Sequence, residues 1–144
     1  MDDGTGPGGL AAFAGRWTLS RRIEDATGRV TGRLSGSAVF APADGGLDYT
    51  EDGELVLPGQ GTFHATRRYL WRDAGAGRVE VLFDDGRPFH ALDLSAPVAE
   101  ASHWCDPDAY AVRLDLSDWP RWRSEWRVRG PRKDYRMVSD YARP

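Results

Sequence analysis

Short runs in which apolar and polar residues alternate make up most of the chain, and a period of two predicts β-strands. Turn pairs such as Asp85-Gly86, Pro58-Gly59 and Gly130-Pro131 separate neighbouring runs. The pattern predicts ten strands over residues 15–24, 30–41, 47–57, 61–72, 78–84, 88–94, 99–105, 109–116, 122–129 and 134–142. Residues 10–13 are expected to form a short helical turn before the first strand.

Nearly every connection between these strands has hairpin length, and no long helical pattern interrupts them. The sequence therefore predicts an all-β fold, an up-and-down antiparallel barrel whose closure removes exposed strand edges. Residues 1–9 are expected to be a flexible lead, and residues 10–144 a single domain. The spacing of Trp119, Trp122 and Trp126 also fits one face of a helix, but the alternation over 122–128 favours a strand.

Five charged or titratable residues share the strand face that otherwise carries core residues: Arg21, Glu51, Arg67, His90 and His103. An unpaired charge in a low-dielectric interior costs several kcal/mol, so such groups are expected to be paired, hydrated or used on a ligand. A barrel of about eight to ten strands has room for one small ligand. The pattern therefore predicts a cavity with a polar lining.

The overall charge and composition exclude several classes of partner. The 144 residues carry a formal charge of −3, with 19 basic residues scattered among 22 acidic ones, which is no nucleic-acid footprint. No apolar run approaches the length of a membrane span, and the acidic, Gly-rich start lacks a secretory signal. One cysteine, Cys105, excludes an internal disulfide. A cytoplasmic protein with neither a nucleic-acid nor a membrane partner is expected, and no pattern defines its oligomeric state.

Arg21, Glu51 and Arg67 come from the first, third and fourth predicted strands. Two guanidinium groups suit the carboxylate or phosphate of a ligand, with Glu51 orienting one of them. The surplus positive charge favours an anionic ligand. Two alternatives are an ion-pair network that satisfies itself, and arginines that reach out through a barrel mouth.

His90 and His103 lie on consecutive predicted strands, and antiparallel pairing would bring their rings together. With Cys105, two residues after His103, they would offer zinc, copper or iron three ligands, although the usual metal-site spacings are absent. Acid–base chemistry or a hydrogen bond to a ligand is the favoured role of the histidines. Cys105 by itself is expected to be a small buried residue.

Gly15-Arg16-Trp17 resembles the Gly-x-Trp signature of the calycins, the lipocalin and fatty-acid-binding-protein superfamily. This resemblance implies that Trp17 plugs one end of the barrel and that a cation near the last strand, Arg136 or Arg143, lies over it. Further motifs resemble an uncharacterised bacterial and fungal family of single-domain lipocalin-like proteins, a domain of unknown function. They are Leu47-x-Tyr49-x-Glu51-x-Gly53, Arg67-x-Tyr69-Leu70-Trp71, Asp85-Gly86-Arg87-Pro88-Phe89-His90, His103-x-Cys105-x-x-Asp108-x-Tyr110 and Gly130-Pro131-Arg132-Lys133-Asp134-Tyr135. The resemblance implies a fold and no activity.

The leading hypothesis is a barrel that binds a small molecule, anionic and partly aromatic, without a cofactor or metal. The residues expected to contact this ligand are Arg21, Tyr49, Glu51, Arg67, Tyr69, Trp71, His90, His103 and Tyr110. One alternative is a cofactor-independent lyase or isomerase with His90, His103 or Glu51 as catalytic candidates. Another is a barrel that holds haem or a metal.

Overall fold

The computed structural model describes residues 6–144, and nearly all of this range is β-structure. A single-turn 3-10 helix, η1 (Leu10–Phe13), precedes ten strands. They are β1 (Gly15–Asp25), β2 (Val30–Ala43), β3 (Gly46–Leu57), β4 (Gly61–Gly75), β5 (Arg78–Phe83), β6 (Pro88–Asp93), β7 (Val98–Cys105), β8 (Asp108–Asp115), β9 (Trp122–Arg129) and β10 (Asp134–Ala142). All ten predicted strands are present, and the segment around Trp122 is a strand. Residues 1–5 of the expected lead lie outside the described residues.

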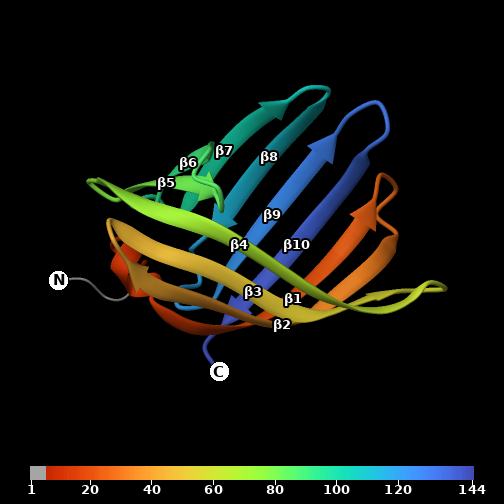
Figure 1. Ribbon diagram of the computed structural model, residues 1–144, viewed down its shortest axis with the longest axis horizontal. Coiled ribbons are helices and arrows are strands. Elements are labelled where there is room, and N and C mark those ends of the chain that lie inside the picture. Colours follow the sequence, from red (N-terminus) through yellow and green to blue (C-terminus); the bar gives the residue numbers. More distant parts are fainter. Residues whose placement is uncertain (1–5) are drawn as a thin grey trace.

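The ten strands form one antiparallel sheet in the order β6-β5-β4-β3-β2-β1-β10-β9-β8-β7. Each strand pairs with its neighbour along the chain except at one place, where β6 lies against β7 without a hydrogen-bonded ladder in the described chain. In addition, β1 pairs with β10. Figure 1 shows the sheet curling round so that its two edge strands, β6 and β7, lie near each other. The predicted up-and-down, lipocalin-like barrel is confirmed. It is nearly closed, and the β6–β7 contact is called the seam below.

One end of the barrel is filled by aromatic side chains. Phe13 of η1 and Trp17 of β1 are fully buried, and the indole Nε1 of Trp17 donates a 2.8 Å hydrogen bond to the carbonyl oxygen of Phe13. The rings of Trp119 and Trp122 lie 4.8 and 5.2 Å from that of Phe13. The guanidinium carbon of Arg143 lies 3.7 Å from the centre of the Trp17 ring. Arg143 therefore supplies the cation over Trp17, the position for which Arg136 was the other candidate.

The opposite end is open because two neighbouring strands of the barrel wall are short. β5 and β6 have six residues each, whereas β4 has 15. β4 pairs with β5 only from Tyr69 to Gly75, so within the described chain residues 61–68 pair with β3 alone. In Figure 1 the β3–β4 hairpin extends well beyond the β5–β6 hairpin. The interior is therefore accessible above the β5–β6 turn.

A β-bulge in the pairing of β5 with β6 changes which residues of β6 face inward. Val81 pairs with His90 but Leu82 pairs with Pro88, so Phe89 is an extra residue in β6. Because the bulge breaks the alternation, the consecutive residues Phe89 and His90 both line the interior. Within residues 6–144, no helix has the length and apolar character needed to cross a bilayer.

Candidate functional site

Arg21 of β1 and Glu51 of β3 form an ion pair inside the barrel. Nη1 and Nη2 of Arg21 donate hydrogen bonds of 2.9 and 2.6 Å to the two carboxylate oxygens of Glu51, and Nε donates a 2.7 Å bond to Oγ of Ser139. Arg21 is 7% exposed and Glu51 4%. All three guanidinium nitrogens of Arg21 therefore have protein partners, as in the alternative of an ion-pair network that satisfies itself.

Two tyrosines extend this ion pair into a buried network. The hydroxyl of Tyr49 donates to Glu51 and shares a 2.8 Å hydrogen bond with the hydroxyl of Tyr141. Burial alone would raise the pKa of Glu51, but the hydrogen bonds and charge of Arg21 outweigh it and hold that pKa below its usual value. Burial also raises the pKa of Tyr49 and of Tyr141. The network is thus a carboxylate and a guanidinium held between neutral phenols.

Arg67 of β4 stands directly opposite Glu51 in the strand register but has a different environment. It is exposed at the open end, because β5 does not extend beside this part of β4. In the described chain it forms no ion pair with a carboxylate, whereas its neighbour Arg68, on the outer face, pairs with Asp48 at 3.0 Å. No carboxylate of the described residues therefore neutralises Arg67, and its side chain lines the barrel mouth.

A pocket of about 710 Å³, called the mouth pocket below, occupies the open end. Two arginines, six aromatic residues and five smaller or polar residues line it: Arg67, Arg87; Tyr69, Phe83, Phe89, Tyr110, Trp126, Tyr135; Pro88, His103, Cys105, Val128 and Met137. None of the described residues that line the mouth pocket carries a carboxylate. The pocket is thus broad, mostly aromatic and positively charged.

Stacked rings form the floor of the mouth pocket. The ring of Phe89 lies 4.4 Å from that of Phe83 and 5.1 Å from that of Trp126, with interplanar angles of 20° and 9°. Tyr69 stacks on Phe89 from β4 at 5.7 Å. This aromatic stack gives the pocket an apolar surface that suits the ring of a ligand.

A smaller space of about 50 Å³, called the inner cavity below, lies deeper in the barrel. Its walls include the buried network around Glu51, together with Trp71 and His90. Arg67, Tyr69, Phe89 and Trp126 line both the inner cavity and the mouth pocket. The two spaces are therefore adjacent, and Phe89 and Trp126 form part of the partition between them.

The two histidines lie on opposite sides of the seam. No ladder joins β6 and β7 in the described chain, and the ring of Phe89 contacts both imidazoles, at 4.9 Å for His90 and 5.2 Å for His103. His103 lines the mouth pocket and His90 the inner cavity. Burial, assisted by the charge of His103, lowers the pKa of His90 to about 4. His90 is therefore a neutral imidazole near pH 7.

The expectation that Cys105 is a buried residue is wrong. Cys105 is exposed, because it ends β7 at the rim of the mouth pocket, where no wall covers it. Within residues 6–144, no three His, Cys, Asp or Glu side chains are arranged to hold a metal ion.

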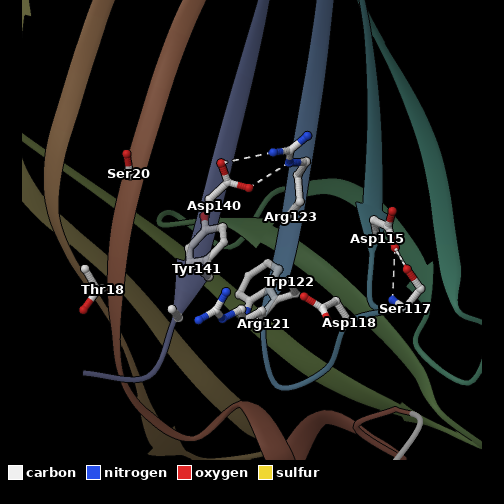
Figure 2. A pocket seen from close by; sticks show the side chains of 11 residues that line it. Thr18, Ser20, Asp115, Ser117, Asp118, Arg121, Trp122, Arg123, Asp140 and Tyr141 are labelled. Carbon is white, nitrogen blue, oxygen red and sulfur yellow. Dashed lines mark hydrogen bonds and ion pairs between the residues drawn. The ribbon is translucent and has the colours of Figure 1, made fainter.

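A third pocket, of about 460 Å³, lies on the outer wall near the filled end. Figure 2 shows two groups of interacting side chains there: Arg123 pairs with Asp140 at 2.7 Å, and Asp115 accepts hydrogen bonds from Ser117. These groups satisfy each other at the surface. The outer pocket is therefore a weaker candidate than the barrel interior.

All nine residues predicted to contact a ligand line the two interior spaces. Seven border the inner cavity and four the mouth pocket, Arg67 and Tyr69 being common to both. Contact between these residues and a ligand stays a prediction. Sequence reasoning missed Phe89, whose inward position depends on the bulge, and Ser139, whose small side chain gives no signal in the strand pattern.

The fold and the lined interior define this protein as a calycin-like barrel. The chain belongs to a family of unknown function, DUF6314, which matches residues 13–143. No protein with a curated description matches the chain in sequence. Among solved structures, the S-type phycobiliprotein lyase CPES from Guillardia theta is similar, with a TM-score of 0.63 and 7% identity over 91% of this chain and 88% of that one. At this identity the likeness establishes the fold.

Proposed function

We propose that the protein binds a small, anionic and partly aromatic molecule in the mouth pocket. The observation that carries the proposal is the lining: two arginines and six aromatic residues, with no carboxylate among the described residues, around about 710 Å³. This volume falls within the range of roughly 300–1,000 Å³ typical of small-molecule sites. Apolar walls with a few convergent polar groups are also typical of such sites.

Arg67 is the principal anion contact in this proposal. Its charge is not neutralised by a carboxylate in the described chain, so binding an anion does not require an existing ion pair to break. Arg87 is a secondary contact, because it already pairs with Asp85 at 2.7 Å and lies over the Phe83 ring at 5.3 Å. Arg21 takes a structural role, since Glu51 and Ser139 occupy its nitrogens.

Anilinonaphthalene sulfonate, a fluorescent aromatic anion, tests this proposal directly. We expect one molecule to bind per barrel with increased fluorescence, and Arg67→Met to weaken binding by about 10-fold or more. A hydrogen bond to a charged group contributes about 1.5–3 kcal/mol, and 1.4 kcal/mol corresponds to a factor of ten. Fluorescence titration measures the dissociation constants.

Arg68→Met is the matched control, because Arg68 is the next residue of the same strand and points to the outer face. It should leave the affinity within about 2-fold, since an exposed ion pair contributes little. Phenylnaphthylamine carries the same kind of rings without the sulfonate, and its binding should be insensitive to Arg67→Met. Equal effects of Arg67→Met and Arg68→Met on the anionic probe would contradict the proposal.

A further inference from the structure

We propose that the inner cavity is a second subsite for the same ligand, which accommodates an uncharged hydroxyl or carbonyl group and presents His90 as its hydrogen-bond partner. The inference rests on the proposed function, because the anionic end of the ligand is placed in the mouth pocket. It assigns the ligand to a narrower class: aromatic anions that carry a second, neutral polar group away from the negative charge.

The first observation is an unsatisfied atom. Nδ1 of His90 is buried and has no hydrogen-bond partner within the described chain. Buried polar atoms in folded proteins nearly always have a partner, and an exception calls for an explanation such as an absent ligand or ordered water. His90 lines the inner cavity, so its partner can come from the contents of that space.

Most other polar groups around the inner cavity already have partners. The exceptions are Arg67, which pairs with no carboxylate of the described residues, and Nε1 of Trp122, which is buried without a hydrogen-bond partner there. Arg21 and Glu51 bind each other through two hydrogen bonds, and the hydroxyls of Tyr49 and Tyr141 join the same network. Rearranging this network to serve His90 would break a buried ion pair. Nδ1 of His90 and Nε1 of Trp122 are therefore the two buried ring nitrogens of this lining that an additional polar group in the cavity would serve.

The β-bulge is the structural device that aims His90. Because Phe89 is the extra residue of β6, the strand turns both Phe89 and His90 inward. Bulges of this kind are common beside functional sites, where they redirect a side chain. In a regular strand, one of these two residues would point to the outside.

The size and position of the inner cavity restrict what it accommodates. About 50 Å³ holds a small polar group or a water but no aromatic ring, whereas the adjoining mouth pocket holds rings. Phe89 and Trp126 border both spaces, so a ring that lies in the mouth pocket beside them projects a substituent past the partition. Burial keeps the pKa of His90 near 4, so the imidazole is neutral and suits an uncharged partner.

Three pairs of rigid aryl carboxylates test the inference: benzoate, naphthoate and biphenyl carboxylate, each with and without a hydroxyl at the end opposite the carboxylate. The three lengths sample different distances between Arg67 and His90. We expect at least one hydroxylated member to bind about 5-fold or more tightly than its parent in isothermal titration. His90→Phe should abolish that preference without weakening the parent compound, and His64→Phe, an exposed residue on the outer face, should retain it.

Each outcome decides a different claim. If parents and hydroxylated compounds bind equally in all three pairs, or if the preference persists in His90→Phe, the second subsite is wrong and the proposed function stands. If none of the six carboxylates binds, the proposed function is wrong and the subsite with it.

A measurement on the unmodified protein covers the case in which His90→Phe does not fold. The side-chain nitrogen resonances of His90 should shift when the preferred hydroxylated compound is added, and should shift much less with its parent. His64 supplies the internal reference, because it pairs with Asp52 outside the barrel. Identical His90 spectra with both compounds would overturn the subsite.

Discussion

At the scale of single residues, the Arg21–Glu51 pair shows how charges become part of a barrel interior. Arg21 donates through all three nitrogens, and Glu51 accepts from Arg21 and from Tyr49. Desolvation of two charges opposes the attraction between them, and only good geometry with additional hydrogen bonds offsets it. The pair is therefore expected to contribute little net stability while being costly to break.

A double-mutant cycle at this pair separates the two effects. Glu51→Leu and Arg21→Met should each lower the free energy of unfolding by about 3–5 kcal/mol, because each leaves a buried charge unpaired. The double variant should lose less than either single variant, since no unpaired charge remains. Urea denaturation at neutral pH measures all four proteins. Losses that simply add would show that the charges act independently.

The low pKa of His90 predicts a pH dependence of stability. The folded protein takes up the His90 proton only near pH 4, whereas the unfolded chain does so near 6.5. Between these values the unfolded state binds more protons, so the free energy of unfolding should fall as the pH falls. From pH 7 to 5 this linkage amounts to about 2 kcal/mol.

His90→Leu should remove that part of the pH dependence, and His64→Leu should not, because the ring of His64 is exposed. Denaturant unfolding at several pH values between 5 and 7 gives the slopes. This window lies above the range in which most carboxylates titrate. Parallel slopes in the wild type and His90→Leu would contradict the prediction.

Most of the site residues could be predicted from strand phase, but their partners could not. Arg21, Glu51 and Arg67 share a phase with core residues, which indicates an inward direction. Phase does not show that Arg21 is saturated by Glu51 and Ser139, or that Arg67 is exposed beside a short neighbouring strand. These contacts depend on residues far apart in the chain.

At the scale of elements, the strands follow from alternation and turn chemistry, and the ten predicted ranges correspond to the ten observed strands. An alternating pattern does not reveal where a β-bulge interrupts the alternation, and the bulge at Phe89 is such an interruption. Close approach between strands is also set by context. Gly36 pairs with Gly53, and a Cβ on Gly36 would lie 2.1 Å from the carbonyl oxygen of Asp52, so glycine lets β2 and β3 come together there.

Strand length is the element-scale property that shapes the site. β5 and β6 end early, which leaves the upper part of β4 without a partner on that side and exposes Arg67 to the mouth pocket. The sequence predicts these short strands, because turn residues bracket them closely. Their consequence for access becomes visible only once β4 is known to be the longer neighbour.

At the scale of the whole molecule, the two ends of the barrel differ in packing and in charge. The end around Phe13 and Trp17 is filled and held by Arg143, whose guanidinium also donates to the backbone carbonyls of Ala12 and Ala14. The other end is open and cationic, although the chain as a whole carries a charge of −3. The tightly packed aromatic cluster and the open pocket thus lie at opposite ends of the barrel.

The seam leads to a prediction about the whole barrel. β6 and β7 touch without a ladder in the described chain, whereas β1 and β10 pair over eight residues from Thr18 to Asp25. Amide protons exchange slowly where ladder hydrogen bonds are buried in a cooperative core, and quickly at edges. Hydrogen exchange followed by NMR should therefore show high protection throughout β1 and β10. In β6 and β7 it should show protected amides alternating with fast ones, the fast amides being those that face the seam.

Anilinonaphthalene sulfonate, bound in the mouth pocket, should slow the exchange of β6 and β7 more than that of β1 and β10. Uniform protection around the barrel would show instead that the seam is closed by hydrogen bonds in solution.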